Sequence, residues 1–127
     1  HNRTFSLISL FGCGGNRDKA KRPIMGSVAS KYSDHVILTS DNPRNEDPSQ
    51  IISDIVKGVN GSYEIVCDRA CAIKQGFFKC GEGDTLVIAG KGAETTQEIN
   101  GKKKQFSDYE EVYKNIKLRN SILGENS

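Results

Sequence analysis

The sequence contains no apolar run near the roughly 20 residues that a helix needs to cross a bilayer. The first apolar stretch, residues 5–11, is too short to span, and no cleavage pattern follows it. We therefore expect neither a membrane partner nor a signal peptide, and we expect a cytoplasmic protein.

The sequence also lacks the cysteine and histidine spacings that are typical of metal sites and redox-active disulfides. The four cysteines show no Cys-x-x-Cys spacing, and no histidine lies near the pair Cys67 and Cys71. We expect reduced thiols and no metal site. Cys13 has no partner base in the sequence around it, so we do not expect it to act as a nucleophile.

The net charge of +2 is too small to indicate nucleic acid or a membrane surface as a partner. The one basic cluster, Lys102-Lys103-Lys104, is short, and we expect it to be a solvated turn.

The 127 residues are 27% charged and 35% hydrophobic, which is typical of one soluble domain. Short apolar runs alternate with helical patterns, which predicts an α/β sandwich with a mostly parallel sheet and an antiparallel hairpin at its edge. We expect a domain over residues 1–120 and a flexible tail over 121–127. The chain opens directly into a strand, as a domain cut from a larger protein would. The expected strands are 5–11, 35–38, 63–66 and 85–89, the expected helices 23–32, 48–59, 69–79 and one after Ser107, and the hairpin joins 95–99 to 102–106.

Helix positions carry further expectations. Ile24, Val28 and Tyr32 recur every four residues and are expected to face the sheet. Arg69 is expected to be an exposed charge at a helix start, although a phosphate role stays open. His35 at a strand start is expected to be structural. The expected helix caps are Asp47, Asp68 and Ser107.

The stretch Thr39-Ser-Asp-Asn-Pro-Arg44 directly follows a predicted strand. In open α/β sheets, ligands bind beyond the carboxyl ends of the strands. Arg44 can bind a carboxylate and Asp41 an ammonium, and Pro43 stiffens the loop between them. The loop therefore suits a small zwitterion.

Two other predicted strands end in loops that combine glycine with charge. One is Gly12-Cys-Gly-Gly-Asn-Arg-Asp-Lys19, and the other is Gly90-Lys-Gly-Ala-Glu94. Right-handed crossovers between parallel strands place all such loops on one rim. We expect residues 12–22, 41–47 and 90–94 to form one ligand site.

Together these three loops resemble the carboxyl-terminal domain of the Mur ligases, most closely the MurE-type enzymes that add an amino acid to UDP-N-acetylmuramoyl-dipeptide in peptidoglycan synthesis. Residues 12–26, 39–44 and 89–94 resemble its first loop and helix, its amino-acid specificity loop and its last glycine loop. The resemblance covers residues 5–117 and implies a Rossmann-like, three-layer fold. The sequence departs from the family at Ala93, where a histidine is usual.

The resemblance implies ATP-driven amide formation, in which an acyl phosphate is attacked by the incoming amine. The sequence Asp-Asn-Pro-Arg resembles the version of the loop that selects meso-diaminopimelate. Arg44 would bind the distal carboxylate, which lysine lacks, and Asn42 would support Arg44. The family match assigns Arg17 to the carboxylate beside the attacking amine, and it assigns Asp41, Glu94 and the Gly90 carbonyl to the distal ammonium.

The chain lacks the Walker-type phosphate loop, the carbamate lysine and the UDP-sugar domain of the family. ATP and Mg²⁺ would therefore be bound mainly by a central domain outside the chain. We expect no catalytic residue in this fragment and no ligation by it alone, and its partners would be the amino-terminal and central domains. Lys19, Lys21 and Arg22 could approach the ATP phosphates, or could form a solvated helix start.

Other interpretations stay open at this point. A ligase of the same fold could use lysine or ornithine, although Arg44 then has no second carboxylate to neutralise. The chain could instead be a stand-alone module that binds a nucleotide or amino acid, or a structural domain with no site.

Overall fold

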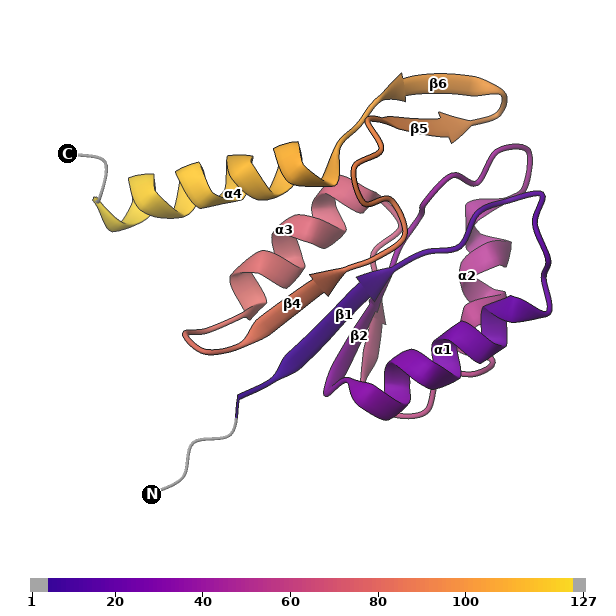
Figure 1. Cartoon of the computed structure of the whole chain (residues 1–127), viewed down its shortest axis with the longest axis horizontal. Coiled ribbons are helices and arrows are strands. Elements are labelled where there is room, and N and C mark those ends of the chain that lie inside the picture. The colour runs from indigo at the N-terminus through magenta and orange to yellow at the C-terminus, as the bar shows by residue number, and fades with distance from the viewer. Residues whose placement is uncertain (1–4, 125–127) are drawn as a thin grey trace.

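A computed structural model describes residues 5–124 and has a four-stranded, fully parallel sheet at its centre (Figure 1). The strands lie in the order β3-β2-β1-β4, so the first strand of the chain is internal. The predicted α/β class is confirmed. The strands are β1 (Leu7–Phe11), β2 (His35–Leu38), β3 (Tyr63–Ile65) and β4 (Thr85–Ile88).

Helices cover both faces of the sheet, which gives three layers (Figure 1). The pair α1 (Lys21–Tyr32) and α2 (Pro48–Val56) contact each other, and so do α3 (Arg69–Lys79) and α4 (Asp108–Leu123). Because each βαβ crossover is right-handed, connections that run toward β3 place α1 and α2 on one face. The return from β3 to β4 places α3 on the other.

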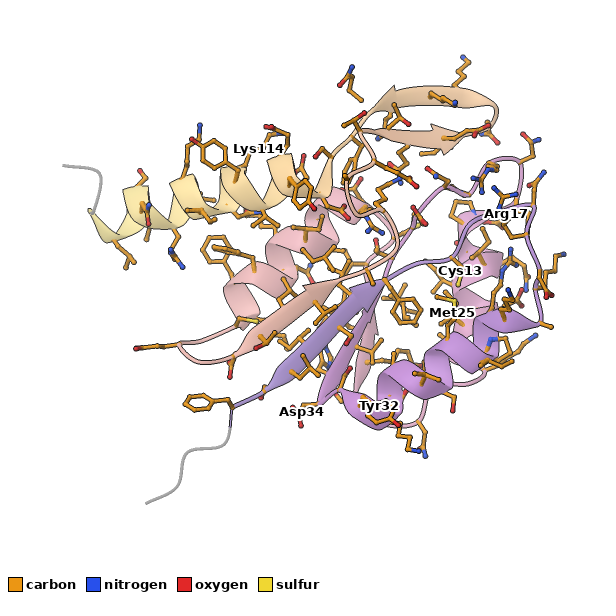
Figure 2. The ribbon with its side chains drawn as sticks, viewed as in Figure 1. Cys13, Arg17, Met25, Tyr32, Asp34 and Lys114 are labelled. Atoms are coloured by element: carbon orange, nitrogen blue, oxygen red, sulfur yellow. The ribbon has the colours of Figure 1, made fainter. Side chains whose placement is uncertain are left out.

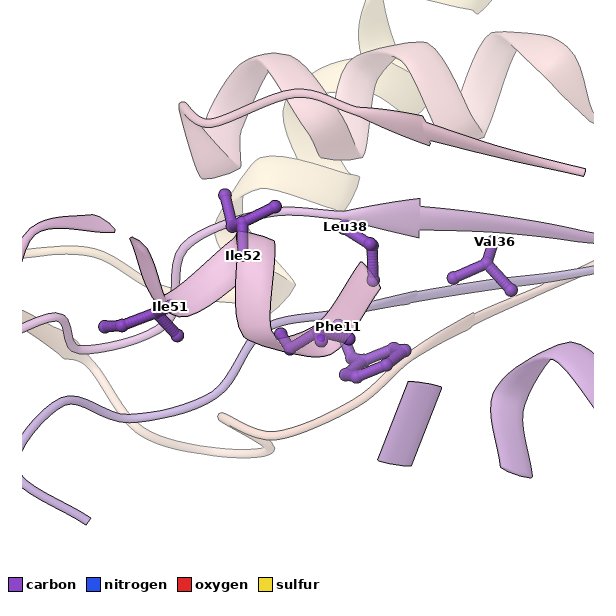
Figure 3. Packing of buried hydrophobic residues seen from close by; sticks show 6 residues of the cluster. Phe11, Val36, Leu38, Ile51 and Ile52 are labelled. Atoms are coloured by element: carbon purple, nitrogen blue, oxygen red, sulfur yellow. The ribbon is translucent and has the colours of Figure 1, made fainter. Parts of the chain in front are cut away.

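The side chains of β2 alternate between two separate cores. Val36 and Leu38 pack with Phe11 and the isoleucines of α2, as Figure 3 shows, whereas Ile37 packs against α3. This period of two is what a strand buried on both faces dictates. The buried cores are formed by Phe11, Val36, Leu38, Ile51, Ile52 and Ile55 on the α2 side, and by Ile8, Leu10, Ile37, Ala72 and Ile73 on the α3 side.

The predicted helix caps are confirmed. Asp47 accepts a hydrogen bond from the Ser49 amide, Asp68 from Cys71 and Ser107 from Glu110. In a capping box at α2, the Gln50 side chain would also bond back to the main chain of Asp47. This second bond does not form, because the Gln50 side chain donates to Asp54 instead.

The predicted hairpin is also confirmed, as β5 (Thr96–Ile99) and β6 (Lys102–Gln105). Its turn residues Asn100 and Gly101 both have positive φ, 51° and 75°, as a type I′ turn requires. The hairpin forms a separate two-stranded sheet and is not an edge of the main one. Its contacts with the loop after β2 include an isolated parallel bridge between Arg44 and Ile99.

The prediction for the buried side of α1 is wrong. Ile24, Val28 and Tyr32 are 61%, 52% and 66% exposed. The helix rests on α2 through Gly26, where an added Cβ would lie 2.3 Å from the Ile55 carbonyl oxygen. That close approach draws α1 toward α2 and leaves Ile24 and Val28 beside an open hollow over β1 and β4.

The sheet ends at β4, and the last helix reaches almost to the end of the chain. Within residues 5–124, no strand pairs with the outer side of β4. Helix α4 continues to Leu123, into the stretch expected to be a tail, and residues 125–127 lie outside the described part. The described residues also include no helix long and apolar enough to span a membrane.

Candidate functional site

The loops that follow β1 and β2 are in direct contact, as predicted. The Gly15 amide donates a 2.7 Å hydrogen bond to the Asn42 carbonyl. A Cβ on Gly15 would lie 1.8 Å from the Pro43 carbonyl oxygen, and one on Gly12 would lie 2.3 Å from that of Thr39. Glycine is therefore required at both positions for the two loops to meet.

Arg44 adopts a left-handed φ of 54°, which is unusual for a residue with a side chain. Main-chain bonds to the hairpin hold it there: the Arg44 amide donates to the Glu98 carbonyl at 3.0 Å, and the Asn100 amide donates to the Arg44 carbonyl at 2.6 Å. Strain of this kind persists where the surroundings over-determine it, which is common at binding sites.

The Arg44 guanidinium lies beside the glycine loop after β1. Its Nη1 donates to the Gly15 carbonyl at 2.9 Å, and its Nε is 3.7 Å from a Glu98 carboxylate oxygen. A Cβ on Gly14 would lie 2.8 Å from Arg44 Nη1 and 3.4 Å from Arg17 Cγ. The absence of a side chain at Gly14 therefore leaves room for the Arg44 guanidinium and for the aliphatic part of the Arg17 side chain. Figure 2 shows Arg17 at this end of the molecule.

Asn42 connects the loop after β2 to the glycine loop after β4. Its side-chain oxygen accepts hydrogen bonds from Lys91 Nζ at 3.0 Å and from the Glu98 amide at 2.9 Å. The Gln97 side chain donates to the Asp41 carbonyl at 2.7 Å. The loop is thus held by the segment that leads from β4 into the hairpin.

Lys91 is part of the candidate site, although the sequence did not predict it. Its side chain is 0% exposed, and Nζ lies 3.2 Å from Asp41 Oδ1 and 3.7 Å from Glu94 Oε1. In the sequence, Lys91 is a lysine between two glycines at the end of a strand. This pattern does not distinguish a buried lysine from a solvent-exposed one. Asp41 Oδ2 faces Gly90, since a Cβ there would lie 3.4 Å from it.

The three residues considered for phosphate differ in their surroundings. Lys19 and Lys21 are exposed, whereas Arg22 is 1% exposed and pairs with Glu46 and Asp54 at 3.0 Å each. The hydrogen bond from Arg22 lowers the pKa of each carboxyl group, and the bond to Glu46 raises the pKa of Arg22. The charge of Arg22 is thus already compensated inside the chain.

The prediction that Arg69 is exposed is wrong, because the residue is 1% exposed. Its Nε and Nη2 donate to the Asp108 carboxylate at 2.8 Å each, Nη1 donates to the Ser40 carbonyl, and Nη2 also donates to the Ala89 carbonyl. Arg69 therefore joins α3 to α4 and fixes the chain just after β2 and β4, below the candidate site.

The surroundings of His35 and Cys13 indicate structural roles. His35 lies between Ser62 and Glu64, at 2.7 Å from each, at the amino ends of the strands and far from the rim that carries the loops. Burial raises the pKa of the Cys13 thiol, which disfavours the thiolate. Among residues 5–124, no three His, Cys, Asp or Glu side chains gather as a metal site would require.

Comparison with known proteins gives consistent matches. The family model described as "Mur ligase, glutamate ligase domain" matches residues 2–92. The chain is 53% identical over 108 residues to the UDP-N-acetylmuramoyl-L-alanyl-D-glutamate--2,6-diaminopimelate ligase of Aquifex aeolicus, covering 84% of this chain and 22% of that protein. It is 51% identical over 121 residues to the Clostridium acetobutylicum ligase 2 of the same name, covering 93% and 24%.

A solved structure of a ligase with this name superposes with a TM-score of 0.87 at 44% identity, covering 91% of this chain and 24% of the solved one. The chain thus spans between a fifth and a quarter of the length of these relatives.

Proposed function

The chain belongs to the Mur ligase family as its glutamate ligase domain, and from this premise we propose that it is the amino-acid-binding part of a cytoplasmic ligase. The whole enzyme would join meso-diaminopimelate to UDP-N-acetylmuramoyl-L-alanyl-D-glutamate, the reaction for which its relatives are named. The observation that carries the proposal is that the side chains of Arg44 and Arg17 both lie beside Gly14, with Asp41 on the adjoining loop.

The distal end of meso-diaminopimelate bears a carboxylate and an ammonium, whereas that of lysine bears the ammonium alone. Arg44 offers a planar guanidinium that can pair with the additional carboxylate, and its main chain is held by the hairpin. A site built to pair a polar group rejects an analogue that lacks it, because the group is then left without a partner.

Asp41, Glu94 and the Gly90 carbonyl would accept the distal ammonium. The geometry supports this assignment, because Asp41 Oδ2 faces Gly90 and the Glu94 side chain is 54% exposed. Arg17 is exposed beside Gly14, where it can reach the carboxylate next to the attacking amine.

The energy for the amide bond would come from ATP, which would convert the D-glutamate carboxyl group to an acyl phosphate. The amine of diaminopimelate would then attack the acyl carbon and release phosphate. Lys19 and Lys21 are exposed at the start of α1 and could contact ATP phosphates, whereas the described residues offer no acidic cluster for Mg²⁺. Most of the ATP and Mg²⁺ contacts would belong to a central domain, with the amino-terminal domain holding the UDP-sugar.

An amino-acid competition assay with the full-length enzyme tests this proposal. The enzyme is offered meso-diaminopimelate, lysine and ornithine at equal concentrations, and the products are resolved by mass. Nearly all product is expected to contain diaminopimelate. Preference for lysine or ornithine would contradict the assigned substrate while leaving the family unchanged. We propose neither nucleic acid nor a membrane as a partner.

A further inference from the structure

Lys91 is a lysine whose side chain is entirely buried, although lysine is among the residues least often buried. Its ammonium donates to Asn42 Oδ1 at 3.0 Å and to the Thr96 carbonyl at 2.9 Å, and it is paired with Asp41. Burying an ammonium is costly unless its hydrogen bonds and charge are compensated. The chain compensates this one with groups from the specificity loop and the start of the hairpin.

The partners of Lys91 are the groups that the proposed function places around the distal end of the amino acid. The ammonium approaches Asp41 through Oδ1, while Oδ2 of the same carboxylate faces Gly90. It also lies 3.7 Å from Glu94 Oε1. Lys91 therefore contacts the two carboxylates from the protein side and leaves oxygens of both available to a ligand.

We infer that Lys91 is a positioning residue that sets amino-acid selectivity through its charge, an inference that rests on the function proposed above. Without the ammonium, the region around Asp41 and Glu94 becomes more negative by one unit. A more negative pocket favours an amino acid whose distal end is a bare ammonium. It disfavours one whose distal end also carries a carboxylate, because that carboxylate is repelled.

Lys91 also holds the geometry of the specificity loop. The Asn42 side-chain oxygen has two donors, Lys91 Nζ and the Glu98 amide. Loss of the first leaves the second, so the loop stays tethered to the hairpin. Replacing Lys91 by a neutral residue of similar size that can still donate a hydrogen bond removes the charge and keeps the bond to Asn42. Such a variant therefore separates the effect of the charge from the effect of holding the loop in place.

The test uses the full-length ligase with Lys91→Gln and compares kcat/KM for meso-diaminopimelate with that for lysine. Lys91→Gln keeps an N–H donor and removes the charge. We expect the KM for diaminopimelate to rise about tenfold and the preference over lysine to fall about tenfold, as for loss of one charged hydrogen bond. The KM for ATP should change less than twofold. Lys91→Arg, which keeps the charge, should retain most of the preference, and Lys74→Met, at an exposed lysine of α3, should retain all of it.

An unchanged preference in Lys91→Gln would overturn the inference. So would an equal rise of every KM together with a large fall in melting temperature, which is the signature of a merely structural role. If Lys91→Gln does not fold, Lys91→Met provides the same loss of charge and is judged by the same ratio. Arg44→Ala is measured in parallel, so that the proposed function is tested separately from the role of Lys91. Normal use of diaminopimelate by that variant would refute the proposed function itself.

Discussion

At the scale of single residues, Arg44 has a main chain in the left-handed region and a guanidinium that donates a hydrogen bond to the Gly15 carbonyl. Replacing it by alanine in the full-length enzyme should lower kcat/KM for meso-diaminopimelate by about a thousandfold, because the distal carboxylate would enter the site with no cation to meet it. Steady-state kinetics with purified enzyme would measure the change.

Two variants control that experiment. Arg44→Lys should recover only part of the loss, because an ammonium cannot pair with a carboxylate bidentately. Arg119→Ala, at an exposed position of α4, should behave as the parent enzyme does. Near-normal kinetics of Arg44→Ala with diaminopimelate would show that Arg44 is not the selector.

At the scale of elements, the Arg69–Asp108 pair joins α3 to α4 inside the protein. Arg69→Ala should destabilise the chain by about 3–5 kcal/mol, because it leaves the Asp108 carboxylate buried without its partner. Urea unfolding followed by circular dichroism would measure the free energy. Arg119→Ala, which loses only a contact over the Phe77 ring, should cost less than about 1 kcal/mol. A similar cost for both would refute this role for Arg69.

The cap of α3 gives a prediction for pH. The hydrogen bond from the Cys71 amide lowers the pKa of Asp68, so folding favours its ionised form. The cap therefore stabilises the protein above the unfolded-state pKa of about 3.9, and the contribution is lost as the pH falls through the lower folded-state pKa. Asp68→Ala should cost about 1 kcal/mol at pH 7. The gap between the two proteins should shrink as the pH falls below the unfolded-state pKa and through the lower folded-state pKa, and a constant gap would contradict the assignment.

Features that depend on neighbours in sequence could be predicted, whereas those that depend on packing could not. The caps and the Asn100-Gly101 turn are decided within four residues. The placement of the three loops on one rim follows from the parallel strands. The orientation of α1 is set by where α2 lies, and the burial of Arg69 is set by Asp108, which is 39 positions away in the sequence.

At the scale of the whole molecule, the 127-residue chain should not catalyse ligation by itself. It carries the proposed amino-acid site, while its relatives are about four times as long and would supply the ATP and UDP-sugar contacts. A coupled assay for phosphate release, with all substrates present, should show no rate above background. The full-length enzyme in the same assay is the control, and ATP-dependent product from the short chain would refute the expectation.

The outer side of β4 has a consequence for the chain in isolation. Alternate amides and carbonyls of this strand, those of Leu86 and Ile88, point away from β1, and Val87 beside them is 42% exposed. An apolar edge that no strand among residues 5–124 covers is a template for another strand, so concentrated samples should self-associate through it. Sedimentation should report a mass that rises with concentration, and Val87→Lys should keep the chain monomeric. A wild-type chain that stays monomeric at millimolar concentration would show that the edge is already protected.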